Sequence, residues 1–375
     1  MKKLNHNDYI ALNSILLSKE MSRAKLVDIL GITAPAVFKI VKKLTEKKLI
    51  LPSSQLLPSN GGRPRRVLIL NNNYKKIVGI FLSNDYISTT IAKLDGEIIE
   101  TRVRKRSYTM LQVKLIKMLV EEIEYVIEQY GKNNVAGIGL AIPGIIDPKA
   151  GIIKKSHIFK GENIRIEQYI SDTFEIPCVI ENDIRAMLHA EKLFGNLKED
   201  KNAFFVFLQN GIGSSLLIDD QIHAGANFGA GQLDSTYSNT DITLGSYCEN
   251  SNILDRLSHY KNVDTENMTV CDIFKKANEN IDPYKSLVVD MGQKIGLALS
   301  NVLKILDIGK ILLAGKLLTN YPCMIDTIKE TVEINIDQSL YNNTDINFSN
   351  LENIEALGAL ALVINNLFEG KKLIK

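Results

Sequence analysis

The sequence predicts an α/β protein in which an N-terminal winged helix-turn-helix is followed by a duplicated α/β body. Residues 22–48 contain two short helical patterns joined by a glycine turn. After residue 75, three strand-like segments, a long helical segment and a buried strand follow one another, and a second half of this kind lies downstream. The first 75 residues are also strongly basic, whereas the other 300 are acidic.

The helix-turn-helix is predicted from the spacing of apolar residues. Residues 7–17 form a supporting first helix. The apolar faces of the next two helices are marked by Leu26, Ile29 and Leu30, and then by Val37, Ile40, Val41 and Leu44. Between these faces, residues 31–33 supply a glycine able to take a positive φ, an apolar residue, and a hydroxyl that can cap the next helix. The second helix of such a pair can enter the DNA major groove.

Candidate DNA contacts lie on this second helix and on the predicted wing. They are Thr33, Ala34, Pro35 and Phe38 in the first turns, Lys39, Lys42 and Lys43 on the outward face, and Arg63, Arg65 and Arg66 in a loop between strand-like segments at 49–51 and 67–70. Arginines in a wing suit phosphates or a narrow minor groove. The apolar first turns offer few hydrogen bonds to base edges, and Phe38 fits a core position equally well. DNA binding is therefore expected to be electrostatic and weakly specific, or partly lost.

The charge distribution supports this interpretation. Residues 1–75 contain 14 Lys and Arg against 4 Asp and Glu, a net charge of +10, and the other 300 residues contain 31 against 39, a net charge of −8. A basic head on an acidic body indicates that only the head meets a polyanion. The alternative, a merely solvated basic face, is disfavoured because the charge coincides with the helix-turn-helix.

Composition argues against several other classes of protein. The four cysteines (Cys178, Cys248, Cys271 and Cys323) are far apart and include no C-x-x-C pair, so neither a disulfide framework nor a zinc ribbon is expected. The sequence has no signal-peptide pattern and no apolar run of the ~18 residues needed to cross a bilayer. These features predict a cytoplasmic protein.

Three segments beyond the head carry a family resemblance: GIGLAIPGIID at 137–147, IPCVIEND at 176–183 and ILLAG at 311–315. In this order, and together with the helix-turn-helix and the GGRP of 61–64, they resemble the ROK family of sugar-responsive repressors and sugar kinases. The resemblance covers nearly the whole chain. It implies two actin-like (RNase H-like) lobes with a ligand cleft between them, and a dimer.

The resemblance and the order of elements together predict the domain boundaries. The winged helix-turn-helix is placed at 1–75, the first actin-like lobe at 76–190, and the second lobe, with the dimerisation helices, at 191–352. A final apolar helix within 353–375 is expected to return to the first lobe.

Departures from the family pattern argue against enzymatic activity. The family's kinases have an Asp-x-Gly-x-Thr loop after the first strand, whose glycines let backbone amides approach the ATP phosphates. This chain has FLSND at 81–85, with no glycine. The zinc module is reduced to Cys248 without a nearby histidine, which cannot complete a four-ligand site. No catalytic residue, cofactor or metal is therefore predicted.

The resemblance also implies a residual ligand cleft. Asn182 and Asp183 match the family's sugar-binding pair, in which the aspartate takes a proton from a sugar hydroxyl; alternatively, Asp183 caps the helix that starts near Ile184. Gln232 and Ser235 stand where the family has Glu and His. Losing polar partners should weaken hexose binding severely, so the cleft is expected to hold a different small molecule or none.

Two functional interpretations remain open, and a third is least favoured. The first is a dimeric transcriptional regulator of the ROK repressor branch that binds a pseudo-palindromic DNA operator. The second is an antirepressor that acts by contact with another repressor protein, with weak or no specific DNA binding. The third is a sugar kinase.

Overall fold

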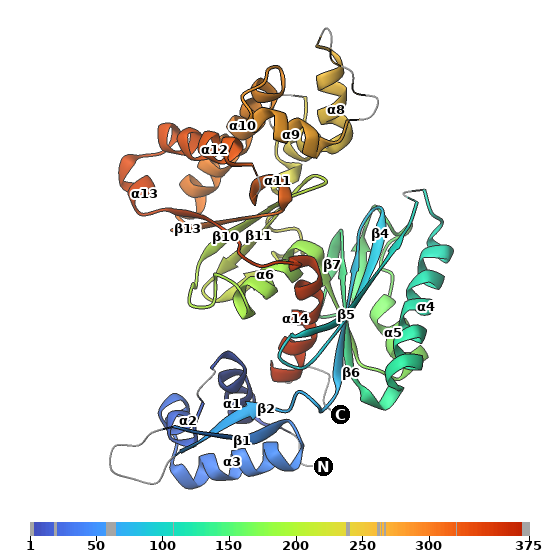
Figure 1. The fold of residues 1–375 in the computed structure, drawn as a ribbon, viewed down its shortest axis with the longest axis vertical. Helices are drawn as coiled ribbons and strands as arrows, with labels where there is room; N and C mark the ends of the chain where they lie inside the picture. Colours follow the sequence, from blue (N-terminus) through green and yellow to red (C-terminus); the bar gives the residue numbers. More distant parts are fainter. Residues whose placement is uncertain are drawn as a thin grey trace. The chain divides into compact units, whose positions relative to one another are not determined.

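The computed structural model describes residues 4–18, 21–57, 65–107, 109–237, 241–260, 263, 265, 268–319 and 321–369. The chain divides into two compact units (Figure 1). One comprises Met1–Leu193 with Asn353–Lys375, and the other comprises Phe194–Glu352. In the described ranges, no helix is both long enough and apolar enough to cross a membrane.

The N-terminal head contains three helices and a two-stranded sheet, as predicted. Its elements are α1 (His6–Leu17), α2 (Arg23–Leu30), α3 (Ala34–Glu46), β1 (Ile50–Leu57) and β2 (Arg65–Leu70). α2 ends at Gly31, whose φ of 61° places it in the left-handed region that glycine adopts without strain. β1 and β2 pair antiparallel from Ile50 opposite Leu70 to Leu57 opposite Arg65. Residues 58–64, which include the predicted GGRP segment, lie outside the described ranges.

The apolar stripe of α3 explains how the head packs. The four residues predicted for this stripe are all buried, and they alternate with exposed residues at helical spacing. α1 and α2 add buried side chains to the same core, among them Leu12, Ile15 and Leu26. The opposite face of α3 is consequently left on the surface.

The remainder of the first unit is a five-stranded sheet covered on both faces. The strand order is β5-β4-β3-β6-β9, with bounds β3 (Lys76–Leu82), β4 (Tyr86–Ala92), β5 (Ile98–Lys105), β6 (Val135–Ile142) and β9 (Cys178–Asn182). β3, β4 and β5 pair antiparallel, whereas β6 pairs parallel with both β3 and β9. A short turn, η1 (Lys132–Asn134), precedes β6, and the hairpin β7 (Ile145–Asp147) and β8 (Ile152–Lys155) follows it.

Helices from distant parts of the chain cover the two faces of this sheet (Figure 1). One face packs on α4 (Gln112–Tyr130) and α5 (Ile166–Phe174), whose apolar side chains share a core with Val78 and Ile80 of β3. The other face packs on α14 (Ile354–Glu369), which lies against α6 (Asp183–Leu193). Gly79 makes this approach possible, because a Cβ there would lie 2.9 Å from the backbone nitrogen of Leu360. The final helix thus returns to the first sheet.

The second unit repeats the plan of the first. Its sheet has the order β12-β11-β10-β13-β14, with bounds β10 (Ala203–Leu208), β11 (Ile212–Ile218), β12 (Gln221–His223), β13 (Lys310–Ala314) and β14 (Asp345–Phe348). Three antiparallel strands are again followed by two parallel ones. The predicted duplication is therefore visible in the strand order.

The helices of the second unit form one large apolar core with the sheet. They are η2 (Leu233–Ser235), α7 (Leu244–Cys248), α8 (Asn250–Ser258), α9 (Val270–Asn278), α10 (Tyr284–Leu306), α11 (Lys316–Thr319), α12 (Pro322–Asn335) and α13 (Gln338–Asn342). α10 packs closely on α12, since a Cβ on Gly292 would lie 2.9 Å from Cβ of Thr327.

Candidate nucleic-acid interface and ligand residues

The exposed face of α3 begins with the residues predicted to face DNA. Thr33 is the N-cap residue of α3 by conformation, but its side chain makes no capping hydrogen bond. Ala34, Pro35 and Lys39 are exposed beside it. Phe38 is 51% exposed. The core alternative for Phe38 is therefore wrong, because about half of this residue is open to solvent.

Lys43 does not lie on the outward face as predicted. Its Nζ is 2.5 Å from Oδ2 of Asp8, a residue of α1 that is only 1% exposed. The same carboxylate oxygen accepts a hydrogen bond from the backbone N–H of Asn5, so it also closes the cap of α1. The expectation failed because helical spacing alone does not show that α1 brings the buried Asp8 to this position. Lys43 ties α3 to α1 instead of facing solvent.

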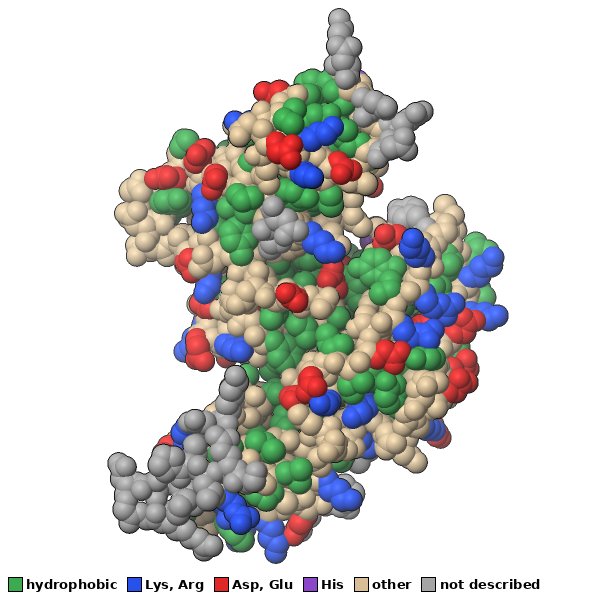
Figure 2. Space-filling view, in the orientation of Figure 1, with side chains coloured by type: hydrophobic (Ala, Val, Ile, Leu, Met, Phe, Trp, Pro, Cys, Tyr) green, Lys and Arg blue, Asp and Glu red, His purple; other side chains and the backbone are tan. Residues whose placement is uncertain are grey.

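The other predicted cations of the head lie on α3, on β2 and in the segment before β2. Lys42 is exposed and lies 3.8 Å from Glu46 one turn further along α3. Arg66 is exposed on β2, opposite Leu56 of β1. Arg65 belongs to β2, although its side chain is not described, and Arg63 lies outside the described residues. Figure 2 shows Lys and Arg side chains along the part of the head that α3 forms.

Sequence reasoning missed one basic residue of this surface. Arg23 is the first residue of α2, directly after the N-cap Ser22. It is exposed, and its guanidinium carbon lies 5.1 Å from the centre of the Phe38 ring. The sequence could have indicated Arg23 by its position at the start of the first helix of the motif. In this kind of domain, that helix crosses the DNA backbone.

Asn182 organises the junction between β9 and α6. Its Oδ1 accepts hydrogen bonds from the backbone N–H groups of Ile184 and Arg185, both at 3.1 Å. Its Nδ2 donates to the carbonyl of Gly144 at 3.0 Å and to Oδ1 of Asp183 at 2.8 Å. Asn182 is thus the capping residue of α6. The alternative that Asp183 caps this helix is wrong, because Asp183 is already its first residue.

A buried ion pair stabilises the same junction. Nη2 of Arg185 lies 2.7 Å from Oε1 of Glu181, and it also donates to the carbonyl of Ile146 at 2.9 Å. Both side chains are almost fully buried. These bonds hold the end of β9 against the turn that follows β6, so Asn182 and Asp183 are rigidly positioned.

The connection from β3 to β4, residues 83–85, is held together by its own side chains and by neighbouring ones. Oγ of Ser83 donates to Oδ1 of Asp85 at 2.7 Å, and Nη1 of Arg106 donates to the carbonyl of Ser83 at 2.7 Å. Nε2 of His157 lies 2.5 Å from Oδ1 of Asn84. Burial, with a smaller contribution from Arg106, lowers the pKa of His157. Phe81 is buried against Tyr86, with ring centres 6.1 Å apart.

The sequence profile of the ROK family matches residues 77–366, which is most of the chain. The chain belongs to the ROK family. It is 25% identical to the xylose repressor of Bacillus spizizenii over 98% of this chain and 97% of that one. Among solved structures, it resembles a ROK family transcriptional regulator described as a homologue of the Escherichia coli MLC protein. That match has a TM-score of 0.84, 19% identity, and 98% coverage of both chains.

A ROK hexokinase from Thermus thermophilus shares the fold over a smaller part of the chain. The match has a TM-score of 0.64 and 18% identity, and it covers 79% of this chain and all of the hexokinase. The two-lobed actin-like fold predicted for the body is therefore confirmed, and ROK proteins with different activities share it.

The remaining two candidate ligand residues lie in the second unit of this ROK protein. Gln232 precedes the short helix η2 and Ser235 ends it. Both are exposed, and the backbone N–H of Ser235 donates to the carbonyl of Gln232 at 3.2 Å. Their roles in ligand binding remain a prediction.

Cys248, at the predicted remnant of the ROK zinc module, is fully buried in the core of the second unit. Burial raises the pKa of its thiol to about 12. A metal-binding cysteine must lose this proton, and the environment opposes that loss. Across the described ranges, no three His, Cys, Asp or Glu side chains are grouped in a way that would hold a metal ion.

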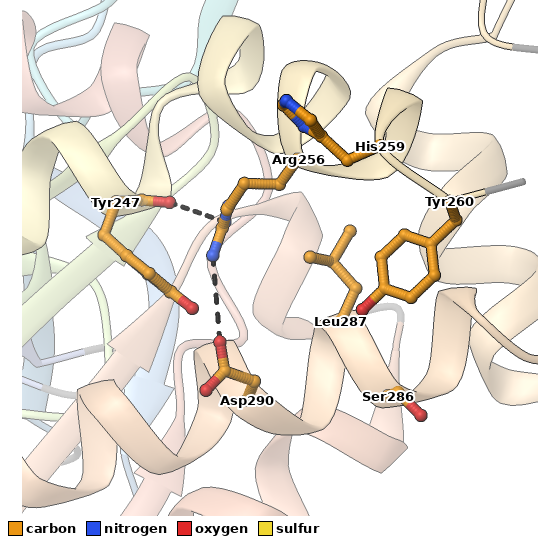
Figure 3. A pocket seen from close by; sticks show the side chains of 7 residues that line it. All are labelled: Tyr247, Arg256, His259, Tyr260, Ser286, Leu287 and Asp290. Carbon is orange, nitrogen blue, oxygen red and sulfur yellow. Dashed lines mark hydrogen bonds and ion pairs between the residues drawn. The ribbon is translucent and has the colours of Figure 1, made fainter.

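Arg256 lines a pocket of about 400 Å³ in the second unit (Figure 3). Its Nη2 donates to the carbonyl of Tyr247 at 2.8 Å, and its guanidinium stacks 3.7 Å from the centre of the Tyr247 ring. Asp290 faces it at 3.8 Å, and burial raises the pKa of that carboxyl group. The charged group of Arg256 interacts with Asp290 and with Tyr247. These contacts join α7, α8 and α10, so we interpret the cluster as structural.

Proposed function

We propose that this ROK protein is a transcriptional repressor that binds DNA through its N-terminal winged helix-turn-helix and has no sugar kinase activity. The observation that carries the proposal is the exposed face of α3, which joins Thr33, Phe38, Lys39 and Lys42 on one surface. Such a helix, preceded by a glycine turn and followed by a two-stranded wing, is the part of these domains that enters the major groove.

The relatives and the charge of the head support the same proposal. The xylose repressor of Bacillus spizizenii aligns over 98% of this chain, so the alignment includes the head as well as the body. The head carries a net charge of +10 on its first 75 residues. Attraction to the phosphate backbone dominates the affinity of most DNA-binding proteins. The protein would act in the cytoplasm as a dimer on a two-fold symmetric operator, with recognition helices one helical turn apart.

The segment 81–85, which ends β3 and leads into β4, supports the absence of kinase activity. A kinase loop of this family needs glycines so that backbone N–H groups reach the phosphates. Here Phe81 is buried, and the guanidinium of Arg106 donates a hydrogen bond to the carbonyl of Ser83. The side chains of Ser83, Asn84 and Asp85 are each hydrogen-bonded to protein groups.

The test uses the full chain and double-stranded DNA selected by it from a random library. Affinity is measured by fluorescence anisotropy between 50 and 200 mM salt. We expect log Kd to change linearly with log salt, and Lys39→Gln to reduce the slope by about 0.9. Lys304→Gln, at an exposed lysine on α10, is the matched control and should leave the slope unchanged. Failure to enrich any sequence, or ATP turnover with a hexose, would contradict the proposal.

The second candidate is an antirepressor that binds another repressor protein. The favouring observation is the apolar character of the exposed first turns of α3, where Ala34, Pro35 and Phe38 provide contact area but few hydrogen bonds. Exposed aromatic residues are common anchors of protein interfaces. This candidate would replace the first if library selection yields no preferred DNA sequence while a repressor co-purifies with the wild-type chain and is lost with Phe38→Asp.

A further inference from the structure

Arg23 and Phe38 form a contact between the two helices of the motif. The guanidinium carbon of Arg23, at the start of α2, lies 5.1 Å from the centre of the Phe38 ring on α3. This is within the ~6 Å over which a cation is attracted to the face of an aromatic ring. The ring is 51% exposed, so the pair lies on the surface of the head.

The guanidinium of Arg23 carries hydrogen-bond donors that no described residue of the head accepts. Among the described residues, the guanidinium of Arg23 has no hydrogen-bond or ion-pair partner, and it lies against the Phe38 ring. A guanidinium has five N–H donors in its plane. Contact with a ring uses none of these donors, so they stay available to an acceptor from outside the protein.

The neighbouring lysines of α3 differ from Arg23. Lys42 lies near Glu46, whereas Lys43 is paired with Asp8 and is not on the exposed face. An arginine that is already held in one place loses less side-chain freedom on binding than a free lysine does. A planar guanidinium also matches two oxygens of a phosphate at once.

The position of Arg23 indicates what it binds. In a helix-turn-helix, the second helix enters the major groove and the first crosses the sugar–phosphate backbone. Arg23 begins the first helix, where the helix dipole also favours an anion, and it lies beside the N-terminal half of the second.

We propose that Arg23 binds a DNA phosphate at the edge of the major groove, and that Phe38 is the residue that positions it. Phe38 thereby acts on affinity through Arg23 instead of reading a base. The inference rests on the proposed DNA-binding function and adds to it one phosphate contact and a role for the exposed ring.

The experiment measures Kd against salt for the full chain on its selected DNA and on a scrambled duplex. Arg23→Gln should weaken binding to both duplexes by about three- to tenfold and reduce the slope of log Kd against log salt by about 0.9. Arg23→Lys should keep the slope but weaken binding, because it keeps the charge and loses the planar fork. Lys304→Gln is again the control for charge alone.

Phe38 is tested in the same assay. Phe38→Leu should weaken binding to both duplexes equally and add little to Arg23→Gln in the double variant, since the two residues act as a unit. Phe38→Tyr should retain binding. Thermal unfolding verifies that these surface variants remain folded.

Three results are decisive. An unchanged slope and affinity for Arg23→Gln would overturn the phosphate contact while leaving the proposed function intact. A change of sequence preference with Phe38→Leu alone would show that the ring reads a base, and would overturn its positioning role. If the wild-type chain binds no DNA, the proposed function fails and this inference fails with it.

Discussion

Lys43 of α3 and Asp8 of α1 form an ion pair inside the head, with Nζ 2.5 Å from Oδ2. The lysine side chain is 21% exposed and the aspartate side chain only 1%. A lysine that looks like a DNA contact in the sequence is therefore part of the fold. Basic residues of the head therefore have two roles: Lys43 stabilises the fold, whereas exposed residues such as Lys39 are proposed to bind DNA.

The first prediction concerns this pair. Lys43→Met should lower the free energy of unfolding of the head by about 2–3 kcal/mol, because it leaves a buried carboxylate without its cation. Lys39→Met, at an exposed position on the same helix, should change it by less than about 0.5 kcal/mol. Urea unfolding followed by circular dichroism measures both. Equal effects of the two variants would show that the pair contributes nothing.

The second prediction concerns the cap of α6. Asn182→Ala should destabilise the first unit by about 1–2 kcal/mol, because two backbone N–H groups at the start of the helix lose their acceptor. Asp183→Ala should have a smaller effect, since Asp183 is not the capping residue. Denaturant titrations of the two variants compare them directly, and a larger loss for Asp183→Ala would contradict the assignment of the cap.

The third prediction concerns the close approach of α14 to the sheet. A Cβ on Gly139 would overlap the carbonyl oxygen of Ala359, and one on Gly79 would lie 3.0 Å from Cβ of Ala359. Gly139→Ala should therefore displace α14 and destabilise the protein by about 3 kcal/mol or more. Gly309→Ala is a milder control, because the nearest atom to its Cβ would be 3.3 Å away. A Gly139→Ala variant with wild-type thermal stability would refute this packing.

The fourth prediction concerns cysteine reactivity. Because burial raises the pKa of Cys248 to about 12 and that of Cys178 well above its usual value, both should resist alkylation in the folded protein at pH 8. Cys271 is exposed and should react. Iodoacetamide labelling followed by peptide mass spectrometry distinguishes the sites, and rapid labelling of Cys248 under native conditions would contradict its burial.

The raised pKa of Cys248 also predicts that the protein loses stability at high pH. The unfolded thiol loses its proton near its ordinary pKa of 9, whereas the folded thiol keeps it up to about 12. The folded state then binds more protons, so this contribution to stability is complete below pH 9 and is lost as pH rises from 9 to 12. Cys248→Ala should remove that part of the pH dependence in thermal unfolding curves.

The sequence alone was sufficient for the order and type of the main elements. Val37, Ile40, Val41 and Leu44 repeat at helical spacing, and that pattern can only bury one face of α3, so the helix follows from local chemistry. The eight buried residues of β6 likewise form an unbroken apolar run, which is typical of a central parallel strand. The glycine at position 31 predicted the turn because its left-handed conformation is costly for other residues.

Tertiary structure decided which polar side chains serve the fold and which face outward. Periodicity places Lys39, Lys42 and Lys43 on the polar part of α3 alike, but only packing against α1 brings Asp8 to Lys43. Likewise, Asn182 and Asp183 are neighbours of similar chemistry, and the path of the chain from β9 into α6 decides which of them caps the helix. The contact between Arg23 and Phe38 joins two helices across a turn. Local patterns determine helices and strands because those depend on near neighbours in the chain, whereas ion pairs, caps and ring contacts depend on which distant residues the fold brings together.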